Sequence, residues 1–120
     1  MAKFGFSNEE WNTAKKEIKD ILIARAKLRG MIPYSDLVNH IQAIHLEAHD
    51  IRLFHLLGDI STEEDAKGRG MLSVIVVHKH GDMQPGPGFF ELAEDLGRDT
   101  TDILRCWINE LNKVHAYWGK

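Results

Sequence analysis

The sequence predicts an α+β domain, in which amphipathic helices pack around a small β-sheet. Apolar residues recur at helical spacing near both ends of the chain, and one unbroken β-branched run, residues 74–77, lies between turn-forming glycines. With 120 residues, of which 43% are hydrophobic, the chain is long enough for one core and too short for two. We therefore expect a single domain over residues 1–120.

The first predicted helix begins at Ser7 and ends near Gly30. Ser7 and Glu10 form a capping-box pattern, and Gly30 is expected to act as the C-terminal cap. An apolar stripe at helical spacing follows the cap and consists of Trp11, Ala14, Ile18, Ile21, Leu22 and Leu28.

Two further helices are expected before the β-branched run. Ser35 or Asp36 can cap a short helix after Pro33, which disfavours helical geometry at the residue before it. A third helix is predicted from Asp50 through residue 60, with an end left open by Gly58. Its expected inward residues are Ile51, Phe54, Leu57 and Ile60.

The second half of the chain is expected to hold one strand and two helices. Residues 61–70 read as an exposed polar connection, residues 71–79 as a buried strand, and residues 80–87 as a Gly/Pro loop. A short helix ending at Gly97 follows, and Asp99, Thr100 or Thr101 is expected to start the last one. The strand needs a pairing partner, which could be a short strand near residues 31–32, residues near the glycine loop, or another chain.

Charge and cysteine content exclude several classes of protein. The net charge is −3, although residues 1–30 hold seven Lys/Arg against four Asp/Glu. A mildly acidic chain argues against a strong general DNA binder, while a small basic face stays possible. The single cysteine, Cys106, cannot form an intramolecular disulfide, and no apolar run approaches the length of a membrane span. We expect a cytoplasmic protein.

Four short motifs carry a resemblance to a known fold. They are Tyr34-Ser35-Asp36-Leu37, Leu56-Leu57-Gly58, Met71-Leu72-Ser73-Val74 running into Val76-Val77, and Pro85-Gly86-Pro87-Gly88-Phe89. This layout resembles winged-helix modules of uncharacterised bacterial proteins and is similar to the DNA-binding domain of the alkylguanine alkyltransferase and alkyltransferase-like family. The resemblance implies a helix-turn-helix followed by a strand and a wing, with further helices at both ends. The family's Pro-Cys-His-Arg motif is replaced here by Val76-Val77-His78-Lys79, so alkyl transfer is not expected.

The winged-helix reading implies a set of nucleic-acid contacts. Gln42, His49 and Arg52 are candidates for the groove, and Lys67, Arg69 and Lys79 are candidates near the wing. Carboxylates such as Asp50 and Asp59 lie among them and would repel phosphate.

Protein interaction is the leading alternative, and catalysis ranks third. Trp107, Tyr117 and Trp118 lie on or near one stripe of the last helix and could anchor a partner or a homodimer. A small hydrolase would need a pair such as Glu91 with Asp95, or His78 with Glu91. The histidine pairs His78/His80 and His45/His49 do not supply three metal ligands, so no metal or cofactor is expected. The expected function is non-catalytic recognition of a nucleic acid, or of a protein of a nucleic-acid-processing or defence system.

Overall fold

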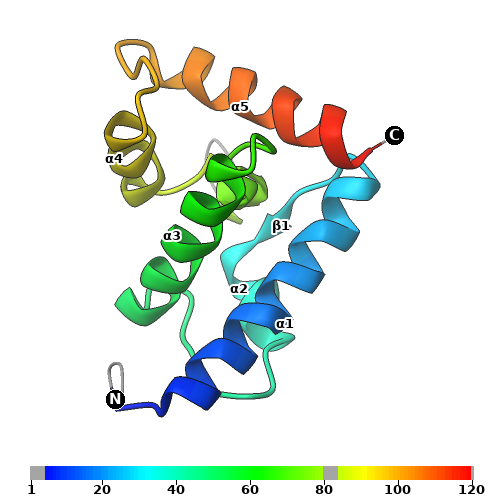
Figure 1. Cartoon of the computed structure of the whole chain (residues 1–120), viewed down its shortest axis with the longest axis vertical. Coiled ribbons are helices and arrows are strands. Elements are labelled where there is room, and N and C mark those ends of the chain that lie inside the picture. Colours follow the sequence, from blue (N-terminus) through cyan, green and yellow to red (C-terminus); the bar gives the residue numbers. More distant parts are fainter. Residues whose placement is uncertain (1–4, 80–83, 120) are drawn as a thin grey trace.

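The computed structural model describes residues 5–79 and 84–119 and is mostly helical, with 64% of these residues in helices (Figure 1). The α+β composition is confirmed. In chain order the elements are α1 (Asn8–Lys27), β1 (Ile32–Pro33), α2 (Tyr34–Asn39), α3 (Ile51–Ala66), the 3-10 helix η1 (Leu72–Ile75), β2 (Val76–Val77), α4 (Pro87–Asp95) and α5 (Ile103–Trp118).

Helix α1 begins as predicted but ends differently. The Ser7 hydroxyl accepts the Glu10 backbone N–H at 3.0 Å, and the Glu10 carboxylate accepts the Ser7 N–H at 2.9 Å, which confirms the capping box. The predicted cap at Gly30 is wrong, because Arg29 takes the left-handed conformation, with φ of 55°. The Gly30 N–H instead donates to the Arg25 carbonyl and completes the turn. Leu28, predicted to be buried in the stripe, is 80% exposed.

The second and third helices differ from prediction at several residues. Helix α2 starts directly after Pro33 without a side-chain cap, so the caps predicted at Ser35 or Asp36 are wrong. Helix α3 begins next to Asp50 as expected, and Asp50 caps it, but the helix continues to Ala66, so residues 61–66 are not the exposed connection that we predicted. Of the predicted inward residues, Leu57 and Ile60 are buried, but the predictions for Ile51 and Phe54 are wrong, since these side chains are 61% and 40% exposed. Leu53 and Leu56 are buried in their place.

The predicted strand over residues 71–79 is wrong for most of its length. Residues 71–77 are all buried, but Leu72–Ile75 form a 3-10 helix and only Val76–Val77 form a strand. Side chains from other helices bind the backbone groups that a sheet would otherwise pair. The Glu110 carboxylate accepts the Met71 N–H at 2.7 Å, the Ser61 hydroxyl accepts the Ser73 N–H at 3.0 Å, and Trp107 Nε1 donates to the Val74 carbonyl at 3.2 Å.

The sheet is a two-stranded parallel pair, with Ile32 opposite Val76 and Pro33 opposite Val77. The segment near residues 31–32, one of the three pairing partners that we considered, therefore pairs with β2 within the described residues. After β2 the chain turns back, since the His78 N–H donates to the Gln84 carbonyl at 3.0 Å. Residues 80–83 of the predicted loop, including His80, lie outside the described residues.

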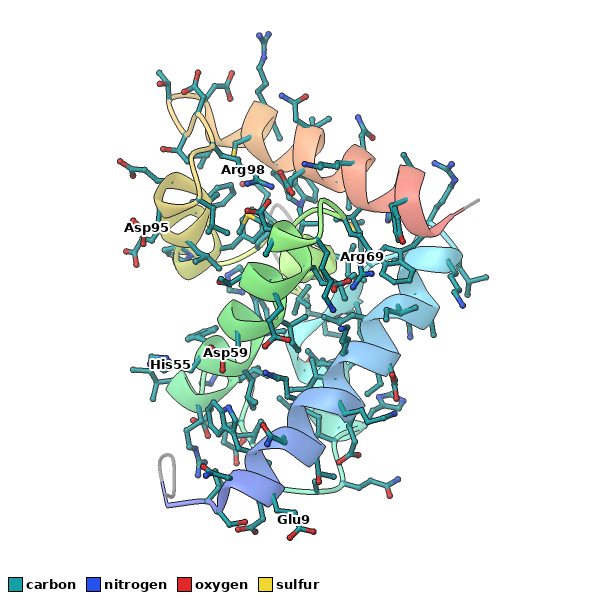
Figure 2. The ribbon with its side chains drawn as sticks, viewed as in Figure 1. Glu9, His55, Asp59, Arg69, Asp95 and Arg98 are labelled. Atoms are coloured by element: carbon teal, nitrogen blue, oxygen red, sulfur yellow. The ribbon has the colours of Figure 1, made fainter. Side chains whose placement is uncertain are left out.

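The core is formed where α1, α3 and α5 pack around η1 (Figure 1). Arg98 follows α4 and joins three elements, because its guanidinium binds Glu110 of α5 at 3.0 Å and Asp65 of α3 (Figure 2). The two carboxylates raise the pKa of Arg98 and keep it charged despite its partial burial. Helix α5 begins at Ile103 with Asp102 as its cap, one residue later than the predicted candidates.

None of the helices within the described ranges combines the length and the apolar character that crossing a bilayer requires.

Candidate nucleic-acid interface

The sequence has three segments without Asp or Glu, residues 21–35, residues 66–81 and residues 111–120. Parts of these segments, residues 25–30, 67–70 and 113–119, lie together at one end of the molecule. His115 Nε2 donates to the Gly30 carbonyl at 3.0 Å, and a Cβ built on Gly119 would lie 2.8 Å from Arg29 Cγ, so the C-terminal ends of α1 and α5 touch (Figure 1). Gly70, which follows α3, also lies against α5, because a Cβ built on it would lie 3.4 Å from Lys113 Cγ. We call this region the basic end, defined by Arg25, Lys27, Arg29, Lys67, Arg69 and Lys113.

Two of these cations have structural roles. Arg25 Nη1 donates to the Met31 carbonyl at 2.9 Å and holds the turn after α1. Arg69 pairs with the fully buried carboxylate of Glu64, and its guanidinium lies 5.6 Å from the centre of the Trp118 ring (Figure 2). Burial would raise the pKa of Glu64, but Arg69 and Lys19 outweigh it and hold that pKa below its ordinary value.

The other four cations, Lys27, Arg29, Lys67 and Lys113, are exposed and form no ion pair with any described residue. The ends of three helices carry partial negative charge here, which favours cations at this position. The last turn of α3 contains Glu63, Glu64 and Asp65, which pair instead with Lys15, Arg69 and Arg98. Glu110 of α5 is buried and is also paired with Arg98. The four cations are therefore available to an anionic partner.

The nucleic-acid residues predicted from sequence are divided between different parts of the surface. Lys67 and Arg69 lie at the basic end. Arg52 instead folds back onto Asp50, with Nε 2.9 Å from Oδ1, and stacks over the Phe6 ring at 5.0 Å. Lys79 lies 4.0 Å from an Asp36 oxygen.

Gln42 and His49 precede α3 and also lie away from the basic end. The Gln42 N–H donates to the Glu17 carboxylate at 3.0 Å, so an acidic group is adjacent to it. His49 lines a hollow of about 440 Å³ together with Ser35 and Lys79. Within this hollow the Ser35 hydroxyl is buried and has no hydrogen-bond partner in the described part of the chain.

The aromatic residues predicted to anchor a partner are partly used inside the domain. Trp107 and Trp118 are half-buried and pack against the core, and the Trp107 indole N–H donates a hydrogen bond to the Val74 carbonyl. Tyr117 is 40% exposed and stands edge-on to Trp118 at the basic end. Helix α5 exposes three other apolar side chains, Ile103, Leu104 and Ile108.

Sequence reasoning missed Lys27, Arg29 and Lys113 as candidates for this surface. The signal that could have found them is the absence of Asp and Glu from three separate segments. Counting charged residues over longer stretches of sequence hides these segments. The contacts between the helix ends are what bring these segments together.

The described residues hold no group of three or more His, Cys, Asp or Glu side chains placed to bind a metal ion. The Cys106 thiol is buried in α5, and burial raises its pKa, which disfavours the reactive thiolate.

The fold and this surface define a helical α+β domain with one basic end. No protein-family model matches the chain, and neither a curated protein nor a solved structure is significantly similar to it.

Proposed function

We propose that the chain is a non-catalytic recognition domain that binds nucleic-acid phosphates through the basic end. The observation that carries this proposal is the set of four exposed cations at or just beyond the C-terminal ends of α1, α3 and α5, none of which forms an ion pair with a described residue. Lysine and arginine side chains that neutralise phosphates release bound counterions, which supplies most of the energy of sequence-independent binding. Exposed Tyr117 adds an aromatic ring beside these charges, and such rings stack on unpaired bases.

The winged-helix arrangement is part of the same proposal. Its support is the element order, because Tyr34 opens α2, α3 follows, and the chain turns back after β2 through the bond from His78 to Gln84. The proposal nevertheless moves the principal contact away from the start of α3. The Asp50 carboxylate there pairs with Arg52, so that cation is already neutralised.

The test is fluorescence anisotropy with labelled 20-nucleotide single strands and duplexes. At about 0.1 M salt, changing Lys27, Lys67 or Lys113 to Gln should each weaken binding by about fivefold, because each change removes one phosphate contact. Arg105→Gln is the matched control, since Arg105 is an exposed cation near the opposite end of α5.

Lys79→Gln distinguishes the two candidate surfaces. Weakening by Lys79→Gln with no effect of Lys67→Gln would place the contact on the Lys79 side of the molecule and contradict binding through the basic end. The absence of measurable binding by the wild-type chain would reject the proposal. Thermal melts of each variant separate lost binding from lost folding.

Protein interaction remains a second candidate because of one observation. Ile103, Leu104 and Ile108 of α5 are each between 43% and 49% exposed, and they could form the centre of a homodimer or a partner interface. Light scattering of the wild-type chain tests the dimer directly.

A further inference from the structure

A cleft of about 370 Å³ lies between α3 and α4, on the side of α3 away from Arg69 (Figure 2). Its apolar walls are formed by Tyr34, Phe54, Leu57, Phe89 and Leu92. A volume of this size is at the lower end of the range for small-molecule sites, about 300 to 1,000 Å³. The cleft can therefore hold a ligand about as large as one amino acid.

The charged groups around the cleft are acidic. Asp59 comes from α3, and Glu91 and Asp95 lie one turn apart on α4, so both walls contribute carboxylates (Figure 2). His55 also lines the cleft, and no Lys or Arg is among the described residues that do. The polar rim is thus opposite in sign to the basic end, and it complements a cation.

Gly58 forms part of the α3 wall and costs the helix stability. A glycine inside a helix is less favourable than alanine by about 0.8 to 1 kcal/mol. Packing does not demand it, because a Cβ at this position would meet only Leu92 Cδ2, at an ordinary distance of 3.9 Å. The effect of the missing side chain is to keep the cleft open.

We propose that this cleft binds a small organic cation, an ammonium group carried on an aromatic or aliphatic body. The body contacts Phe54, Phe89 and Leu92, and the ammonium group donates hydrogen bonds to the carboxylates of Glu91 and Asp95. The aromatic walls add a cation–π attraction. This site is independent of the proposed nucleic-acid contact at the basic end.

Three probes of nearly equal size test the charge requirement. They are phenethylamine, the neutral 2-phenylethanol and the anionic phenylacetate, each titrated into the whole chain and followed by amide NMR shifts. Phenethylamine should shift residues of α3 and α4 saturably, with a Kd of about 1 to 10 mM. The alcohol should bind at least about fivefold more weakly, and phenylacetate should not bind. Equal binding of all three probes, or no saturable shift with phenethylamine, would overturn the proposal.

Substitutions then test whether phenethylamine binds in this cleft. Glu91→Gln together with Asp95→Asn should weaken phenethylamine binding by about tenfold, because it removes two of the three rim carboxylates. Glu94→Gln is the control, since Glu94 is exposed on the same helix but does not line the cleft. Gly58→Leu should block binding by filling the cleft. Loss of affinity in Glu94→Gln equal to that in the double variant would refute the assignment, as would full affinity in Gly58→Leu, provided that thermal melts show both variants folded.

Discussion

At the scale of single residues, local signals predicted the beginning of α1 but not its end. The Ser7 and Glu10 pair and the Asp50 cap act within three residues of sequence, so they can be recognised without a fold. The end of α1 could not be predicted in the same way. Arg29 takes the left-handed conformation beside a glycine that would adopt it at lower cost, and its side chain packs against Gly119 of α5, which is distant in sequence.

Arg29→Gly separates stability from binding. The substitution relieves a left-handed conformation that costs a non-glycine residue about 1 to 2 kcal/mol, against a loss of about 0.5 to 1 kcal/mol from greater freedom of the unfolded chain. We expect denaturant unfolding to show equal stability or a gain of up to about 1 kcal/mol, while affinity for nucleic acid falls because a cation is removed. Arg29→Lys, which keeps the charge, should keep the affinity. A variant that binds as well as the wild type would show that Arg29 takes no part in the contact.

At the scale of elements, the buried run at residues 71–77 shows where pattern reasoning fails. Its burial could be predicted from composition, but its 3-10 geometry could not, because the groups that bind its backbone come from Ser61, Trp107 and Glu110. These partners lie 12 to 39 residues away along the chain. The misplaced end of α3 also depends on partners outside the helix. Ser61 is buried because Ser73, 12 residues away, binds it, and Glu64 is buried because Arg69, five residues away, pairs with it.

The cap of α3 gives a test at this scale. Asp50 accepts the Arg52 backbone N–H at 2.9 Å, and the Arg52 side chain lowers the pKa of Asp50 from 3.8 to about 2. Because the folded pKa lies below the unfolded one, the ion pair stabilises the fold above about pH 4, and this contribution is lost as the pH falls toward 2. Asp50→Ala should lower the unfolding free energy at neutral pH by about 1 kcal/mol, since it removes the cap.

Asp50→Asn removes the negative charge but keeps a capping side chain, because asparagine also caps helices. Its stability deficit relative to the wild type, measured by urea unfolding, should be largest above pH 4 and should shrink as the pH falls from 4 to 2. A deficit that stays constant across this range would mean that the ion pair with Arg52 contributes nothing.

At the scale of the whole molecule, basic and acidic side chains are separated more clearly in the folded structure than along the sequence. The chain carries a net charge of −3, yet exposed cations gather where three helices end, while carboxylates line the cleft between α3 and α4. Sequence analysis placed Lys67 and Arg69 in a nucleic-acid surface because they flank the predicted wing. It could not join them to Lys27, Arg29 and Lys113, since only the packing of α1 against α5 brings these residues together.

The salt dependence of nucleic-acid affinity tests the central claim most directly. If the four exposed cations of the basic end neutralise four phosphates of a duplex, log K should fall against log salt concentration with a slope of about −3.5. A folded variant that combines Lys27→Gln, Lys67→Gln and Lys113→Gln should show a slope of about −1. A slope that is the same in both proteins, or near zero in the wild type, would contradict binding through the basic end.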